Sequence, residues 1–135
     1  MRTQTKLIGI GTILIALLSS ITLLAVLVDV QRPDIYDVSI LPVAPQSGNR
    51  IEIVVYCIDP SGVSLAQLSW SKKGGAWQTQ DMQFIACLCA AGGRWVGDFG
   101  PIYEGDTAEF YVTAFDSSVY RNSADTQVFT LGISS

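Results

Sequence analysis

The sequence contains no histidine, and charged residues make up only 15 % of its 135 positions. Without histidine the chain has no Ser-His-Asp triad, no Cys-His dyad, no His-ligated zinc and no histidine acid–base catalyst. Hydrophobic residues reach 49 %, a composition that excludes an intrinsically disordered chain and a coiled coil. The net charge of −4 has the wrong sign for a nucleic-acid-binding protein. The composition therefore favours a membrane segment, a well-packed core, or both.

One long apolar run lies near the N-terminus. Residues 7–28 carry no charge and would span roughly 33 Å as a helix, enough for a hydrocarbon core of about 30 Å. Asp29, Arg32 and Pro33 end the run. A cleaved signal peptide has a shorter apolar region of about 7–15 residues and a small-x-small cleavage site, which LLAVLVDVQ does not offer. We predict an uncleaved transmembrane helix over 7–28, followed by a linker over 29–34.

The charges on either side of this run predict its orientation. Residues 1–6 hold two bases and no acid, whereas residues 29–135 hold six bases and all twelve acids. Basic residues that flank a membrane segment stay in the cytoplasm. We therefore expect a single-pass protein of the cell membrane, with residues 1–6 cytoplasmic and residues 35–135 extracytoplasmic.

The predicted helix has a face of small residues. Gly9 precedes Thr12, Ala16 and Ser20, which are spaced by four and so share one side of a helix. Small residues let membrane helices approach closely, so this face predicts packing against another helix, either of a partner or of a second copy. The alternative is a simple tether, because small residues are common in such helices.

The rest of the chain has the pattern of strands. Short β-branched and aromatic segments alternate with Gly, Pro, Asn and Asp turns and show no helical period. Pro42 and Pro45 mark the first segment as an edge strand, and the nearly continuous apolar run over 50–58 predicts a strand in the middle of a sheet. The pattern predicts an all-β sandwich of seven to eight strands, over residues 35–43, 50–58, 64–71, 77–79, 82–89, 94–99, 108–115 and 128–131.

Two segments resemble immunoglobulin-like and fibronectin type III-like modules of prokaryotic cell-surface proteins. Asp59-Pro-Ser-Gly-Val63 is similar to the turn that leads to their third strand, and it is followed by Leu68-Ser-Trp70. Gly105-Asp-Thr-Ala-Glu-Phe-Tyr-Val-Thr-Ala-Phe-Asp116 is similar to their sixth strand, although Ser117-Ser-Val119 replaces the usual Gly-Asn after it. The resemblance implies an Ig-like sandwich and says almost nothing about function, since such modules have many roles.

A second resemblance concerns the N-terminus. Gly9-Ile-Gly-Thr-Ile13, followed by an apolar run, resembles the N-terminal helix of archaellins and archaeal type IV pilins. Those families have a basic residue and then a glycine just before the cleavage point, and in this chain Lys6 stands at the position of that glycine. The resemblance implies a pilin-like filament subunit, or an accessory protein of such a machine.

The three cysteines leave several possibilities open. Cys57 lies in the predicted strand 50–58, and Cys87 and Cys89 lie on one face of the predicted strand 82–89. Outside the cytoplasm thiols tend to oxidise, so we expect a disulfide from Cys57 to Cys87 or Cys89. The alternatives are three packed thiols, a link between chains, or a soft-metal site that adds Met82.

The acids and tryptophans suggest no catalytic or metal site. The acids Asp98, Glu104, Asp106, Glu109, Asp116 and Asp125 lack the spacing of a calcium loop or a glycosidase pair, so we expect a solvated acidic surface, with a loosely held calcium ion as the alternative. Trp70, Trp77 and Trp95 are expected in the core rather than on a ligand surface.

The sequence therefore predicts a non-enzymatic protein with no catalytic residue, cofactor or resident metal. The leading hypothesis is a membrane-anchored Ig-like subunit that binds another membrane or cell-surface protein, possibly a second copy of itself. The alternatives are the filament subunit and a module that binds a sugar or a metal ion.

Overall fold

The computed structural model describes residues 29–88 and 93–133 of the chain. These residues form nine β-strands: β1 (Asp34–Leu41), β2 (Asn49–Ile58), β3 (Val63–Lys72), β4 (Gln78–Asp81), β5 (Gln83–Ile85), β6 (Arg94–Ile102), β7 (Thr107–Asp116), β8 (Ser123–Asp125) and β9 (Phe129–Gly132). No helix in this part of the chain is long and apolar enough to cross a membrane. The predicted transmembrane helix over 7–28, with its face of Gly9, Thr12, Ala16 and Ser20, lies outside the described residues.

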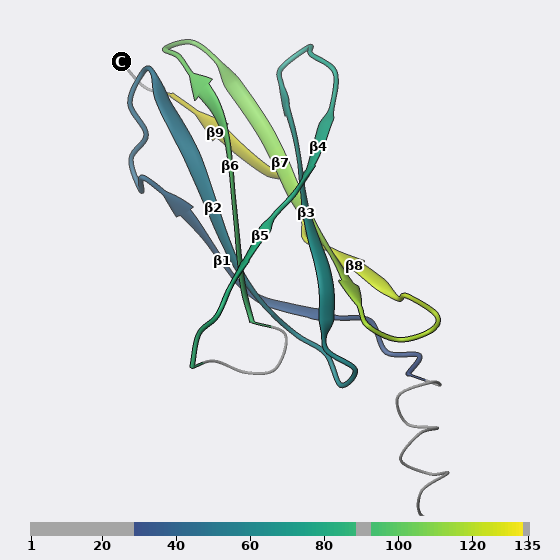
Figure 1. Cartoon of the computed structure of the whole chain (residues 1–135). Coiled ribbons are helices and arrows are strands. Elements are labelled where there is room, and N and C mark those ends of the chain that lie inside the picture. The colour runs from purple at the N-terminus through teal and green to yellow at the C-terminus, as the bar shows by residue number, and fades with distance from the viewer. Residues whose placement is uncertain (1–28, 89–92, 134–135) are drawn as a thin grey trace, which may run out of the picture.

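The strands form two antiparallel sheets that lie face to face (Figure 1). One sheet has the order β1-β2-β6-β5, and the other has the order β4-β3-β7-β8, with β9 also paired to β7. This arrangement confirms the all-β sandwich and is compatible with an Ig-like topology. The edge position expected for the first strand and the central position expected for the second are also confirmed, since β1 is an edge and β2 lies between β1 and β6.

Alternation along the long strands builds the core. Every second residue of β7 is buried, from Ala108 to Asp116, and on β2 the residues Ile51, Ile53, Val55 and Cys57 are inaccessible to solvent. Because strand side chains alternate between faces, each of these strands gives one apolar face to the space between the sheets. The ring of Phe110 lies in this core between two other rings. Its centroid is 5.8 Å from that of Phe99 and 4.9 Å from that of Phe129, on which it stacks.

The chain changes sheets between β4 and β5. β4 pairs with β3 and β5 pairs with β6, with Met82 as the single residue between them. Met82 is buried, and its N–H donates to the carbonyl of Ala66 at 2.8 Å. The strand expected over 82–89 forms only as the short β5, which begins after Met82 and ends at Ile85. The three-residue strand β8 was not expected, because its turn-rich sequence has no apolar alternation.

Candidate functional site

The outer face of the β1-β2-β6-β5 sheet carries a hollow of about 470 Å³. All four strands contribute to it, through side chains that point away from the core: Ser39, Leu41, Glu52, Val54, Tyr56, Ile85, Arg94 and Val96. The outer face of an antiparallel sheet is usually polar, whereas the floor of this hollow is apolar and Val54 is only 9 % exposed. A mostly apolar hollow with a few polar groups is the usual form of a ligand site.

Two neighbouring strands bring opposite charges to this hollow. Glu52 lies on β2, and Arg94 lies on β6 directly opposite Tyr56 of β2. The Nε of Arg94 is buried and has no hydrogen-bond partner among the described residues. A buried donor without an acceptor is costly, but an atom that water does not reach is also out of reach of a ligand. Arg94 lines the hollow, so it can offer a ligand only the terminal nitrogens of its guanidinium.

A second aromatic ring lies beside the hollow. Tyr36 sits at the irregularity where β1 shifts its register against β2. Its ring centroid is 6.0 Å from that of Tyr56, with the rings tilted by 41°, and 48 % of Tyr36 is exposed. Tyrosine combines an apolar ring with a polar hydroxyl and is enriched at binding surfaces, so the pair extends the hollow toward solvent.

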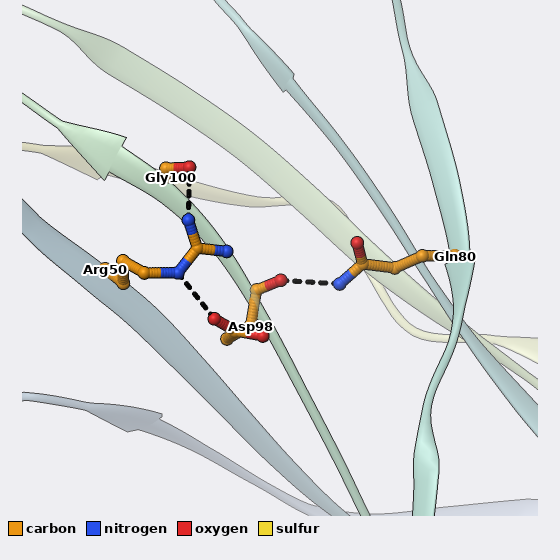
Figure 2. Close-up of polar contacts among 4 residues, drawn as sticks. All are labelled: Arg50, Gln80, Asp98 and Gly100. Carbon is orange, nitrogen blue, oxygen red and sulfur yellow. Dashed lines mark hydrogen bonds and ion pairs between the residues drawn. The ribbon is translucent and has the colours of Figure 1, made fainter.

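A polar network lies beyond Glu52 on the same sheet. The Nε of Arg50 on β2 is 2.6 Å from the Asp98 carboxylate on β6, and its Nη1 donates to the carbonyl of Gly100 at 2.8 Å (Figure 2). From β4 of the other sheet, the Gln80 amide donates to the Asp98 carbonyl. Asp98 is thus in an exposed ion pair, as expected for a solvated acid.

One acid of the expected surface set is not on the surface. Asp116, the last residue of β7, is 1 % exposed, and it meets the buried Asp59 and Asp29. The expectation that Asp116 is solvated was therefore wrong, because the inward alternation of β7 continues to its last residue. Burial, and then the neighbouring Asp29 carboxylate, raise the pKa of Asp59 above its usual range, against the opposing hydrogen bonds from Ser61. Carboxylates in this arrangement can hold a metal ion.

The cysteines differ from the expectation. Cys57 is a free, fully buried thiol on the inner side of β2, so the disulfide expected from Cys57 to Cys87 or Cys89 is not formed. The Cys57 side chain points into the core between the sheets. Cys87 follows the end of β5 and forms a disulfide that does not include Cys57. Cys89 lies outside the described residues. Burial, and then the negative charge of Asp34, raise the pKa of Cys57 to about 12.

The tryptophans divide between core and surface. Trp95 is 6 % exposed and belongs to the core, as expected. Trp70 is half-buried, and its ring is 5.1 Å from Phe99. Trp77 was expected in the core, but it is 47 % exposed and packs on Tyr111, because it lies in the turn before β4 rather than in a strand.

Sequence analysis did not find the residues of the hollow. The signal was present, since Glu52, Val54 and Tyr56 alternate with the buried Ile53 and Val55 in one strand. It was missed because the apolar character of Val54 made the segment look buried on both faces. Arg94 had no such signal, since its place beside Tyr56 comes from the pairing of β2 with β6.

No protein-family model and no curated protein matches the sequence. Among solved structures, one titled as the crystal structure of a bromine derivative of BhCBM56, a carbohydrate-binding module, is similar to this chain, with a TM-score of 0.52. The similarity covers 73 % of this chain and 91 % of that one, at 16 % sequence identity. At this identity the similarity shows a shared β-sandwich fold and nothing finer.

Proposed function

We propose that this chain is a non-enzymatic carbohydrate-binding module, held by its N-terminal apolar segment on the outer side of a membrane. The observation that carries the proposal is the hollow on the outer face of the β1-β2-β6-β5 sheet, with Tyr56, Glu52 and Arg94 gathered over an apolar floor. The sandwich neighbour named as a carbohydrate-binding module supports it at the level of the fold. The charge distribution about residues 7–28 supports the orientation.

The chemistry of the hollow suits a sugar chain. The apolar face of a pyranose ring packs on an aromatic ring, and its hydroxyl groups both donate and accept hydrogen bonds. Glu52 and Arg94 both line the hollow, so a carboxylate can accept hydrogen bonds from a sugar and a guanidinium can donate them. Three strand spacings separate β1 from β5, roughly 14 Å, which gives room for a short oligosaccharide.

The test is binding of the full chain to a panel of soluble neutral and acidic polysaccharides, measured by retardation in affinity gels. The protein should be kept in a detergent without a sugar headgroup, because maltoside or glucoside detergents would compete for the hollow. At least one polysaccharide should bind, and Tyr56→Ala should weaken its binding by about tenfold or more, as expected for an aromatic anchor. Tyr111→Ala is the matched control, since Tyr111 packs on Trp77 in the other sheet, and it should bind like the parent.

Binding by Tyr56→Ala at the parent's level, or no binding to any polysaccharide, would contradict this assignment. The second candidate is then the protein-interaction subunit of a membrane or cell-surface assembly. Apolar side chains at the end of the sandwich where the chain enters favour it: Val30, Val119 and Tyr120 are 74 %, 69 % and 59 % exposed. Asn122 donates to the carbonyl of Asp29 and so holds these two segments together. Partners recovered with the full chain in mild detergent, and lost in Tyr120→Ser, would identify this function.

A further inference from the structure

Three buried aspartates meet at the end of the sandwich where the chain enters. Asp29 precedes β1, Asp59 follows β2, and Asp116 ends β7. In Figure 1 this is the lower end, with the β2–β3 turn and the β7–β8 connection. The three residues are 7 %, 2 % and 1 % exposed, and one carboxylate oxygen of each lies within 4.8 Å of the other two.

The surrounding chain fixes two of these carboxylates firmly. The Oδ1 of Asp116 accepts from the hydroxyl of Ser118 at 2.7 Å and from the N–H of Asn122 at 2.9 Å, and its Oδ2 accepts from the Asn122 amide at 2.8 Å. The Oδ2 of Asp59 accepts from the N–H and the hydroxyl of Ser61 at 3.0 and 2.7 Å. The cluster is therefore a built arrangement of oxygens and not a chance approach of mobile side chains.

Two oxygens within the cluster lack a donor. The Oδ1 of Asp59 and the Oδ2 of Asp29 are buried and have no hydrogen-bond partner within residues 29–88 and 93–133, and the two side chains are in contact. Two carboxylate oxygens can share a hydrogen bond only when one of them is protonated. In the ionised state both require a cation.

Among the described basic side chains, none forms an ion pair with the cluster. The ion pairs among the described residues are Arg50 with Asp98 and Lys72 with Asp106, and neither involves the cluster. A single shared proton would neutralise one of the three carboxylates and leave two negative charges buried together, which is strongly unfavourable. A divalent cation held by the three ionised carboxylates would leave a single negative charge, and it would also contact the oxygens directly.

We propose that Asp29, Asp59 and Asp116 bind a calcium ion. The donors are all oxygen, which suits a hard cation, and Ca²⁺ binds such oxygens at about 2.3–2.6 Å. Two oxygens on opposite sides of Ca²⁺ are then about 4.6–5.2 Å apart, so oxygens within 4.8 Å of one another can share one ion. Mg²⁺ needs shorter bonds of about 2.0–2.1 Å and gives up its water reluctantly, so it should bind more weakly.

This ion would join three separate segments of the chain. Asp29 lies at the start of the described residues, directly after the apolar run 7–28, and the Asn122 amide donates to its carbonyl oxygen at 2.7 Å. A calcium ion would add a link from Asp29 to the end of β2 and the end of β7. It would thereby fix the segment that leads from the apolar run to the sandwich.

The first test is titration of the chelator-washed full chain, in detergent micelles, with CaCl₂ in a calorimeter. We expect one site per chain with a dissociation constant of about 10⁻⁴–10⁻³ M, the range of extracellular calcium modules. At ten times that concentration the melting temperature should rise by about 5–10 °C. Hydrogen exchange of the amides of residues 29–32 and 117–122 should slow when CaCl₂ is added. MgCl₂ at the same concentration should give the smaller response.

Two variants locate the site. Asp59→Asn keeps an oxygen that can accept from Ser61, and Asp29→Asn lies outside every strand, so both should fold and lose calcium binding by tenfold or more. Asp98→Asn removes an acid from the exposed ion pair with Arg50, and it should bind calcium like the parent. Absence of heat and of a melting shift up to about 10 mM CaCl₂, well above the affinity range of such modules, would overturn the proposal in favour of a shared proton. Unchanged calcium binding in both cluster variants would overturn it as well.

Discussion

The two outer faces of the sandwich are built on opposite plans. On the β4-β3-β7-β8 sheet, cross-strand polar pairs cover the surface: Gln67 donates to Asp81 at 3.0 Å, and the hydroxyls of Ser69 and Thr79 are 2.8 Å apart. On the β1-β2-β6-β5 sheet, the strand centres are apolar and the polar groups stand at the margins of a hollow. The first face pairs its polar groups within the sheet, whereas the second leaves Arg94 Nε without a partner among the described residues.

This difference indicates where a ligand would bind. A surface whose polar side chains are already paired gains little from a ligand, because each new hydrogen bond replaces an existing one. An apolar floor gains from burial, and the charged side chains of Glu52 and Arg94 at its margin can bond to a ligand. The comparison therefore favours the hollow over the face that carries Trp77, although that ring is 47 % exposed.

The largest expected effect tests the inner side of β2, on which the hollow depends. Cys57 there has its pKa raised to about 12 from an ordinary value of 9.0. Between these values the unfolded chain loses the thiol proton while the folded chain keeps it, so stability is complete below pH 9 and falls as the pH rises toward 12. The free energy of unfolding should fall by up to about 1.4 kcal/mol per pH unit, as measured by urea titrations across this range.

Tyrosines and lysines also lose protons in this pH range, so the effect must be isolated. Cys57→Ala removes the thiol and keeps an apolar side chain, at a cost of about 1 kcal/mol for the smaller volume. Its stability should depend less steeply on pH than that of the parent. Equal slopes for the two proteins would show that water reaches Cys57 and that β2 is not sealed on its inner side.

The next effect tests the floor of the hollow. Val54→Asp places a carboxylate at a position that is 9 % exposed and lies between β1 and β6. We expect a loss of about 2–3 kcal/mol in the free energy of unfolding, because the new charge stands at a poorly solvated position on an apolar floor. Thermal or urea unfolding of the variant gives this value directly.

The matched control introduces the same charge on the opposite face. Thr79 is exposed on β4, and an aspartate there could accept a hydrogen bond from Ser69. Thr79→Asp should change stability by no more than about 0.5 kcal/mol, as surface substitutions usually do. A similar loss in both variants would remove the proposed contrast between the two faces.

Much of this fold was accessible from the sequence because its long strands carry a strong period. β7 alternates over its whole length, and β2 and β3 are bounded by Gly and Pro turns, so their positions were predicted within one or two residues. The short strands were not, because β5 and β8 have three residues each. A segment of that length carries too few apolar positions to show any period, and its pairing is decided by its neighbours in space.

The candidate sites depended on contacts that the sequence does not encode locally. Asp29, Asp59 and Asp116 are separated by 30 and 57 positions, and only the folding of β2 and β7 brings them together. The cysteine prediction failed for the same reason: Cys57 and Cys87 were each expected in a strand, with a disulfide between the two strands, but β5 ends before Cys87. Spacing along the chain predicts a site when one loop supplies all the ligands, and here three segments supply them.

The smallest expected effect concerns the ion pair at the border of the hollow. Arg50 and Asp98 are about half exposed, with their charged atoms 2.6 Å apart. Such exposed pairs contribute about 0.2–1 kcal/mol and are weakened by salt. A double-mutant cycle with Arg50→Ala and Asp98→Ala should give a coupling energy in this range at low salt, and a smaller one at about 1 M salt, where the Debye length is about 3 Å.

Arg50 also donates to the carbonyl of Gly100, so Arg50→Ala alone should cost more than Asp98→Ala alone. A coupling energy well above 1 kcal/mol that salt leaves unchanged would mean that the pair is effectively buried. The border of the hollow would then be a rigid polar wall rather than a solvated rim.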